Sequence, residues 1–282
     1  VEQRNYNEIN EPKLTFGSKG NGNGNGQLRY PCGITLSSKG NILVTDFGND
    51  RIQIFDSEGK FISTFGSKGN GNGQFRYPKG ITINSKGNIL VCDNNNHRIQ
   101  IFDSEGNFIF TFGSEGYENG QFWYPYGICV DFNDNIYVCD HENHRIQIFD
   151  SKGKFISTFG SYGSMGGQLH GPIGIAINSK GNIIVSDSGN HRIQIFDSEG
   201  NSISTFELEV NEEDELGCAG GLCVDFNDNI LVCNRDNNRI QIFDSNGEFI
   251  SQFKVNSPMD ITIDPKTQNL IVCGFVDYVS IF

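Results

Sequence analysis

The stretch HRIQIFDSEG, residues 97–106, returns letter for letter at residues 191–200. Close copies stand at residues 50–59, 144–153 and 238–247. A phrase repeated along one chain at a fixed period is typical of folds built from repeated copies of one structural unit. We therefore expect the phrase to be scaffold, and the function to lie at the positions where the copies differ.

The period is 47 residues, as the arginine of the phrase shows by its positions: Arg51, Arg98, Arg145, Arg192 and Arg239. Each unit holds four short apolar segments, which in the second unit read GITIN, NILVCD, RIQIF and FIFTFG. Between them lie turns such as SKG and DSEG, where glycine supplies the positive φ of a tight hairpin. Four short antiparallel strands per unit predict one blade of a β-propeller.

The two chain ends predict how the ring closes. After the fifth unit, residues 257–282 supply only three strands, whereas KLTFG at 13–17 matches the last strand of the first unit, FISTFG at 61–66. We expect an all-β fold, a six-bladed propeller of four-stranded antiparallel blades, in which the N-terminal strand completes the sixth blade. The single expected domain covers residues 1–282, with blades at 27–66, 74–113, 121–160, 168–206, 217–253 and 257–282, the last completed by 13–17.

The composition limits the partners and the cellular location that we expect for the chain. The net charge of −13 disfavours indiscriminate binding to nucleic acid or to an anionic membrane. Four of the eight cysteines share a strand position with Thr45 and Ser186, which favours small core residues over disulfide or zinc partners. The chain has no N-x-Ser/Thr acceptor, and we expect a cytoplasmic location. Because it begins at Val1, we expect it to be part of a larger protein.

The arginine of the phrase is expected to pair with the aspartate that ends the preceding strand. The expected pairs are Asp46 with Arg51, Asp93 with Arg98, Asp140 with Arg145 and Asp187 with Arg192. In the fifth unit Asn234 replaces the acid, and in the sixth both partners are absent. Joint loss of both partners favours a structural role. The same recurrence assigns His97, His144 and His191 to turn packing.

The motifs P-x-G-I, G-N-I-x-V-x-D and N-H-R-I-Q-I-F resemble the NHL repeat over almost the whole chain. The chain is thus similar to the C-terminal NHL domains of tripartite-motif (TRIM-NHL) ubiquitin ligases, several of which bind single-stranded or hairpin RNA while others bind proteins. NHL propellers also include a peptidylglycine amidating lyase with zinc and calcium, and sensor domains of bacterial receptor kinases. The resemblance therefore implies the fold and leaves the function open.

In a propeller, the loops joining successive blades and the loops between second and third strands emerge on one face, which we call the top face. The repeat register places these variable residues there: Arg29, Phe47, Arg76, Lys79, Trp123, Tyr126, His141, His170, Arg235 and Phe275. Basic groups interleaved with aromatic rings suit single-stranded RNA, because guanidinium groups meet phosphates while rings stack on bases. Solvated charges and a packed tryptophan are the plainer interpretation.

Across the ring, the run ELEVNEEDE at 207–215 has six acids in nine residues. It would repel a phosphate backbone. A solvated loop and a docking strip for a basic partner both remain open.

An enzyme would need a converging set of catalytic groups. His141 and His170 have no evident third ligand for a catalytic zinc, and Asp260, which replaces a glycine of the other copies, is expected to face the channel alone. We therefore expect a non-enzymatic, monomeric module without cofactor, metal or membrane contact, which binds a protein or peptide through the top face. The alternatives are RNA binding, a metal-dependent lyase or lactonase, and a purely architectural ring in a parent that could carry a ubiquitin-ligase domain.

Overall fold

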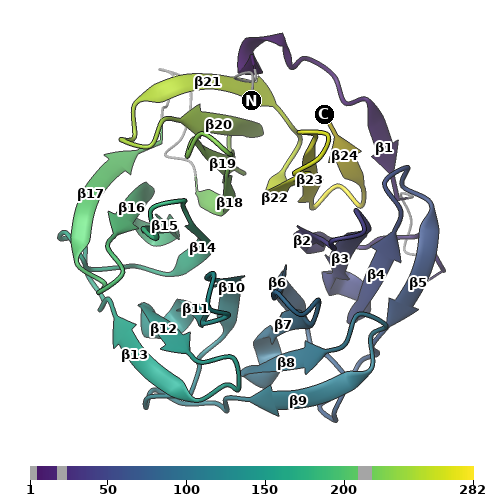
Figure 1. The fold of residues 1–282 in the computed structure, drawn as a ribbon, viewed down its shortest axis with the longest axis horizontal. Coiled ribbons are helices and arrows are strands. Elements are labelled where there is room, and N and C mark those ends of the chain that lie inside the picture. Colours follow the sequence, from purple (N-terminus) through teal and green to yellow (C-terminus); the bar gives the residue numbers. More distant parts are fainter. Residues whose placement is uncertain (1–4, 18–23, 209–217) are drawn as a thin grey trace.

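The computed structural model describes residues 5–17, 24–208 and 218–282, which form six blades around a central channel (Figure 1). Each blade is a four-stranded antiparallel sheet with its first strand nearest the channel and its fourth on the rim. The expected all-β, six-bladed propeller is confirmed. In the part of the chain that the structure describes, the helices are short 3-10 turns, and none is long and apolar enough to cross a membrane.

In each of the first three blades, the four strands follow in chain order from the channel to the rim. Blade one contains β2 (Pro31–Leu36), β3 (Ile42–Asp46), β4 (Arg51–Phe55) and β5 (Phe61–Phe65). Blade two contains β6 (Pro78–Ile83), β7 (Ile89–Asp93), β8 (Arg98–Phe102) and β9 (Phe108–Phe112). Blade three contains β10 (Pro125–Val130), β11 (Ile136–Asp140), β12 (Arg145–Phe149) and β13 (Phe155–Phe159).

The last three blades continue round the ring. Blade four contains β14 (Pro172–Ile177), β15 (Ile183–Asp187), β16 (Arg192–Phe196) and β17 (Ser202–Glu207). Blade five contains β18 (Ala219–Val224), β19 (Ile230–Asn234), β20 (Arg239–Phe243) and β21 (Phe249–Lys254). Blade six contains β22 (Pro258–Ile263), β23 (Leu270–Gly274), β24 (Val279–Ile281) and β1 (Leu14–Phe16). The 3-10 turns are η1 (Tyr6–Glu8), η2 (Phe47–Asn49), η3 (Asn94–Asn96), η4 (His141–Asn143) and η5 (Ser188–Asn190).

The N-terminal strand closes the ring as expected. β1 pairs antiparallel with β24, with Thr15 opposite Ser280. Blade six is therefore assembled from both ends of the described chain, and Figure 1 shows the N and C labels on the same side of the ring. Such closure joins the sixth blade to the first without an unpaired break in the ring.

The hydrophobic cores lie between neighbouring blades. Ile52 and Ile54 of β4 pack on one side with Phe75, whereas Phe55 packs on the other side with Phe16. Every residue of β4 is buried, so both faces of the repeated phrase are covered, as expected. Burying a side chain of this size stabilises the fold by about 1.5–3 kcal/mol. The phrase is therefore scaffold.

In blades one to five the first strands approach one another so closely that the glycine before the first-strand isoleucine or leucine leaves no room for a Cβ. A Cβ on Gly127 would overlap the carbonyl oxygen of Ile173 in the next blade, and one on Gly80 would overlap that of Tyr126. Blade six carries Asp260 at this position. The other five equivalent positions are glycine, so Asp260 is the one residue at this level whose side chain narrows the channel.

The four expected ion pairs are present. Arg51 Nε donates to Asp46 Oδ2 at 2.8 Å, and the carboxylate is fully buried. Arg51 Nη2 also donates to the carbonyls of Gly24 and Gln27, so the pair fastens the loop from the preceding blade. The equivalent Nε–Oδ2 distances are 2.8, 2.7 and 2.7 Å for Asp93–Arg98, Asp140–Arg145 and Asp187–Arg192.

Blade five departs from this pattern because an amide replaces the carboxylate. Asn234 Oδ1 is buried without a hydrogen-bond partner, and Arg239 turns to the Asn237 carbonyl at 3.3 Å and to Gln252 Oε1 at 3.1 Å. Loss of the acid thus redirects the arginine, as a structural pair predicts.

Candidate functional site: the top face and the central channel

A hydrogen bond between neighbouring blades organises the top face at five of the six blade junctions within the described residues. At each of these five, a residue with positive φ just before the third strand accepts a backbone N–H of the following blade with its side chain. Asp50 Oδ1 accepts from Tyr77 at 2.7 Å, and His97 Nδ1 accepts from Tyr124 at 3.2 Å. The same bond joins His144 to Gly171, Asn238 to Ser257 and Asp277 to Tyr30. The structural role expected for His97 and His144 is confirmed.

The residues that donate these bonds also have positive φ. The values are 51° for Tyr30, 55° for Tyr77, 56° for Tyr124 and 58° for Gly171. A bulky residue in this region is an outlier that the surrounding structure must stabilise, and such strain is frequent at functional sites. Tyr30 and Tyr77 are 44% and 40% exposed. Strained backbone therefore presents two aromatic rings to solvent.

Four aromatic side chains lie in a row over blades six, one and two. Tyr30 meets Phe275 edge to face at 5.9 Å between ring centroids, and Phe275 lies 6.5 Å from Phe47. Phe47 stacks on Tyr77 at 4.8 Å. We call Tyr30, Phe47, Tyr77 and Phe275 the aromatic strip. Its members come from three blades, so the ring closure is what assembles it.

Lys79 is held between two rings at the inner end of the strip. Its Nζ lies 4.2 Å from the ring centroid of Phe47 and 4.5 Å from that of Tyr126, and 3.4 Å from the Tyr126 hydroxyl. That hydroxyl lies 3.5 Å from Cys32 Sγ of blade one. Cation–π contacts of this kind contribute about 0.5–2 kcal/mol. Blades one, two and three are thereby linked over the channel mouth.

The other predicted basic residues differ in their surroundings. Arg29 lies over the ring of Tyr30 at 5.8 Å, with its Nε buried and without a hydrogen-bond partner. Arg235 Nε pairs with Asp236 at 3.0 Å. Arg76 is exposed. The predicted basic cluster is therefore largely committed to contacts within the chain.

The predicted tryptophan lies apart from these groups. Trp123 stacks on Tyr117 at 5.5 Å, and Tyr117 belongs to the exposed loop between blades two and three. Its backbone N–H donates to the buried Asp140 at 2.7 Å. The plainer interpretation of a packed tryptophan agrees with this contact.

A histidine-lined pocket of about 240 Å³ lies between blades three, four and five. His141 Nδ1 lies 3.2 Å from the Pro172 carbonyl, while His144 Nδ1 accepts the Gly171 N–H at 3.0 Å. Burial lowers the pKa of both rings. His170 packs edge-on against His144 at 5.5 Å. Within residues 5–17, 24–208 and 218–282, no three His, Cys, Asp or Glu side chains converge in metal-binding geometry.

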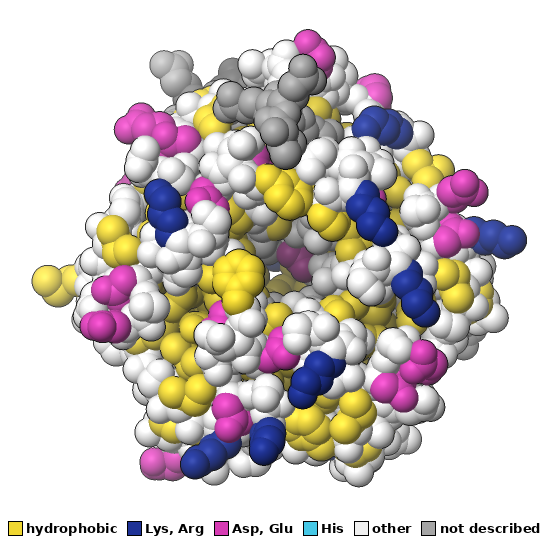
Figure 2. Space-filling view, viewed as in Figure 1, with side chains coloured by type: hydrophobic (Ala, Val, Ile, Leu, Met, Phe, Trp, Pro, Cys, Tyr) yellow, Lys and Arg dark blue, Asp and Glu magenta, His cyan; other side chains and the backbone are white. Residues whose placement is uncertain are grey.

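The opposite face of the ring has a different character. No histidine side chain is visible in Figure 2, which therefore shows the side away from the histidine pocket. Acidic, basic and hydrophobic side chains are interspersed there around a central hollow, without one kind gathering over several blades (Figure 2). The clustered aromatic and histidine side chains are thus a property of the top face.

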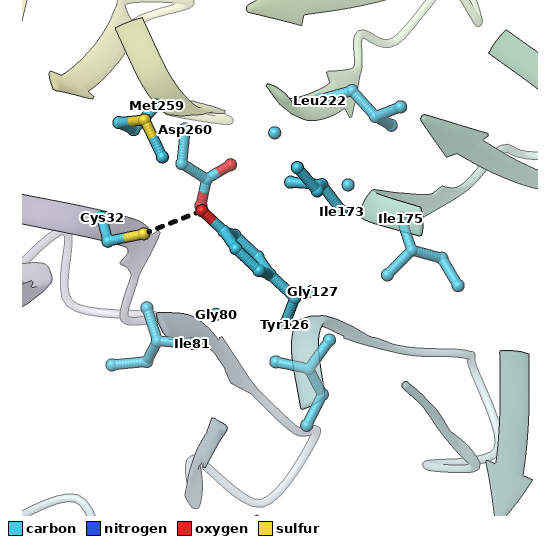
Figure 3. Close-up of a pocket in the computed structure, with 13 residues that line it drawn as sticks. Cys32, Gly80, Ile81, Tyr126, Gly127, Ile173, Ile175, Leu222, Met259 and Asp260 are labelled. Carbon is cyan, nitrogen blue, oxygen red and sulfur yellow. Dashed lines mark hydrogen bonds between the residues drawn. The ribbon is translucent and has the colours of Figure 1, made fainter. Parts of the chain in front are cut away.

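Among the described residues, one buried carboxyl group, that of Asp260, lies in the central channel. Asp260 Oδ2 accepts the Ile34 N–H of blade one at 3.0 Å, and Oδ1 accepts the Ile261 N–H at 2.9 Å. Burial raises the pKa of Asp260 to about 7, although both hydrogen bonds lower it. The cavity beside it has a volume of about 40 Å³, and Tyr126 and Asp260 project toward its centre (Figure 3). Asp260 faces the channel as expected, and backbone N–H groups are its partners.

The sequence did not single out Tyr30, Tyr77 or Tyr124. A signal was available, because the residue before the first-strand proline is tyrosine in three units and glycine, Gly171, in the fourth. Glycine in that register indicates positive φ, so the tyrosines beside it were candidates for strained, exposed positions. The acidic run at 207–215 lies, apart from its first two residues, outside the described residues.

Comparison with known proteins agrees with this architecture. The family model for the NHL repeat matches residues 28–55, 75–102, 122–149, 169–196 and 216–243. Protein lin-41 of Caenorhabditis elegans is 48% identical over 62 residues, which is 21% of this chain and 5% of lin-41. The E3 ubiquitin-protein ligase TRIM71 of Rattus norvegicus is 43% identical over 58 residues, 21% of this chain and 6% of the ligase. The matches thus span about a twentieth of these relatives.

Solved structures share the fold at low sequence identity. A streptogramin B lyase superposes with a TM-score of 0.65 at 17% identity, covering 88% of this chain and 78% of the lyase. A gluconolactonase of Xanthomonas campestris superposes with a TM-score of 0.71 at 14% identity, covering 92% of this chain and 88% of that enzyme. At such identities the likeness establishes the propeller architecture alone.

Proposed function

This chain is an NHL-repeat β-propeller, and we propose that it is a non-enzymatic module that binds a protein or peptide partner through the aromatic strip of its top face. The observation that carries the proposal is the exposure of Tyr30 and Tyr77 on strained backbone. Exposed aromatic side chains are enriched where proteins bind one another. Strain maintained at such positions favours a binding role over a packing role.

The distribution of charge favours a polypeptide over RNA. RNA binding draws most of its affinity from cations that meet phosphates. Lys79 lies between two rings, Arg235 pairs with Asp236, and Arg29 lies over Tyr30, so these cations have competing contacts within the chain. The net charge of −13 adds a repulsive background. Arg76 and the exposed tyrosines keep RNA as the competing outcome of the experiment below.

The channel chemistry also favours binding over catalysis. Asp260 is buried against two backbone N–H groups, and burial raises the pKa of the neighbouring Cys32, so its thiol is a poor nucleophile. His144 uses Nδ1 as an acceptor for a backbone N–H, which leaves that nitrogen unavailable to a metal. The lyase and lactonase activities of the structural neighbours belong to those proteins. All eight cysteines are free, which supports a reducing, cytoplasmic setting for the module.

A comparison of variants tests the proposal. A randomised peptide library and a random single-stranded RNA pool are presented to the wild type, to the Tyr30→Ser/Tyr77→Ser double variant and to Phe132→Ser. Phe132 is 86% exposed in the β10–β11 hairpin, so it controls for loss of any exposed aromatic ring. We expect selected peptides to lose about tenfold or more in affinity with the double variant alone.

Equal peptide affinity in all three proteins would refute the proposal. Binding of the RNA pool that is lost in Arg76→Glu, and that falls steeply as salt rises, would replace it with RNA recognition. Circular dichroism of each variant shows whether the propeller remains folded, so that a loss of binding can be assigned to the surface.

A further inference from the structure

Asp260 shows what the channel-facing backbone of this propeller binds. It bridges the N–H groups of Ile34 and Ile261, which occupy equivalent positions in the first strands of blades one and six. One carboxylate oxygen serves each N–H, at 3.0 and 2.9 Å. In this third of the ring, the oxygens of a carboxyl side chain therefore satisfy two inward-pointing donors.

The strand register directs four more N–H groups the same way. Along an antiparallel strand, residues that hydrogen-bond to the neighbouring strand alternate with residues whose N–H and C=O point the other way. In blade one the bond from Ser37 N to Asn41 O shows which residues of β2 bond to β3. Ile34 is not one of them, so its N–H points away from β3. The matching hairpin bonds of blades two to five start at Asn84, Asp131, Asn178 and Asp225. The same alternation therefore turns the equivalent first-strand residues away from their second strands: Ile81, Ile128, Ile175 and Leu222.

These four residues surround one space. Each belongs to a strand at the channel edge of its sheet, and all four line the cavity of about 40 Å³ beside Asp260 (Figure 3). A cavity needs about 10–15 Å³ of such volume for each water, so it accommodates a few waters or one small ion. The C=O of each residue follows its N–H along the strand, so donors and acceptors lie at separate levels of the channel.

We propose that the central channel binds one small monovalent anion of the halide class on the N–H groups of Ile81, Ile128, Ile175 and Leu222. These four N–H groups point into the channel and do not pair with a neighbouring strand, so together they form a concave anion site of the kind that backbone nests provide. The Lys79 ammonium at the channel mouth, near Tyr126 and Cys32, adds a favourable field. The anion completes the ring of acceptors that Asp260 begins.

The site is sensitive to the charge of Asp260. The titratable groups around this carboxyl are the phenol of Tyr126 and the thiols of Cys32, Cys223, Cys233 and Cys273. Burial raises the pKa of each of them, so they are neutral near pH 7. Asp260, with a pKa of about 7, is the group that changes charge there. Halide affinity should therefore fall as Asp260 ionises above that pH.

Bromide is the probe for the experiment. Crystals of the chain grown at pH 6 in about 100 mM sodium bromide should show an anomalous peak beside the four N–H groups. In solution, the melting temperature is compared in sodium chloride and sodium gluconate at equal ionic strength, because gluconate is too large for the cavity. A halide at 100 times its Kd would raise the folding equilibrium constant about 100-fold.

Two variants separate the anion from general salt effects. Asp260→Asn keeps the side-chain size without the charge, so halide stabilisation should persist from pH 6 to pH 8.5, whereas in the wild type it should be lost at pH 8.5. Asp260→Glu extends the carboxylate into the cavity and should abolish it. Absence of the bromide peak, together with equal melting temperatures in chloride and gluconate for both wild type and Asp260→Asn, would show that the channel holds water and overturn the proposal.

Discussion

The Asp50 carboxylate of blade one accepts the backbone N–H of Tyr77 in blade two at 2.7 Å. Both residues have positive φ, 54° and 55°, so each would be strained without the other. Asp50 is buried, whereas Tyr77 is 40% exposed. One hydrogen bond therefore joins two blades and also sets the position of a top-face aromatic ring.

Removing the acceptor should destabilise this junction. We expect Asp50→Ala to lower the free energy of unfolding by about 1–3 kcal/mol, because the Tyr77 N–H would lose its partner. Asp50→Asn should cost less, since Asn238 makes the same bond to Ser257 at 2.8 Å. Urea unfolding at pH 7 measures both, with the exposed Glu58→Ala as control. Equal losses for Ala and Asn would contradict the assigned bond.

In the buried Asp–Arg pairs, removing the aspartate should destabilise the fold more than removing the arginine. The Asp93 carboxylate accepts from the Arg76 N–H and from the side chains of Asn96, Arg98 and Gln100. Asp93→Ala removes the acceptor of all four donors, so we expect the free energy of unfolding to fall by about 3–5 kcal/mol. Arg98→Met leaves the carboxylate with three donors and should cost less. Thermal and urea unfolding of both variants check the order, and the reverse order would show that the arginine dominates.

The scaffold could be predicted from the sequence because its residues recur. Arg51 and Asp46 are five residues apart in a unit that returns every 47 residues, so one local pattern gave four ion pairs and the blade register. The missing fourth strand of blade six was visible as KLTFG at the other end of the chain. Periodicity carries this information without any knowledge of side-chain geometry.

The site was harder to predict because it depends on contacts between different blades. The register placed Lys79 on the top face, but it did not predict that Phe47 and Tyr126 would enclose its ammonium group from the blades on either side. Trp123 was grouped with the basic residues by register, but its ring stacks on Tyr117 instead. Register fixes where a Cα lies in the ring, whereas the rotamer of a long side chain depends on neighbours that periodicity does not specify.

The glycine ring makes a sharp prediction about packing. Gly127→Ala places a Cβ against the Ile173 carbonyl oxygen, so neighbouring first strands must separate. We expect a loss of about 1–3 kcal/mol or more, as for other overpacked sites. Gly166→Ala is the matched control, because its Cβ would meet nothing closer than Ser202 Oγ at 3.9 Å. Urea unfolding compares them, and equal stability of the two variants would mean that the channel relaxes freely.

Asp260 should make stability depend on pH near neutrality. Its folded-state pKa of about 7 lies above the ordinary value of 3.8, so the folded protein holds a proton that the unfolded chain releases between these values. The contribution of this group to stability is fully present below pH 3.8 and is lost as the pH rises through 7. Across that window the free energy of unfolding should fall by about 1.4 kcal/mol per pH unit from this group.

Asp260→Asn isolates the effect, because other buried carboxylates titrate in both proteins. In chloride-free buffer, we expect the wild type to be more stable relative to Asp260→Asn at pH 5 than at pH 8, by about 2–3 kcal/mol over the titrating range. Urea unfolding at the two pH values gives the four free energies. If the difference between the proteins were the same at pH 5 and pH 8, Asp260 would be ionised throughout, and its two backbone N–H bonds would outweigh the cost of burying its charge.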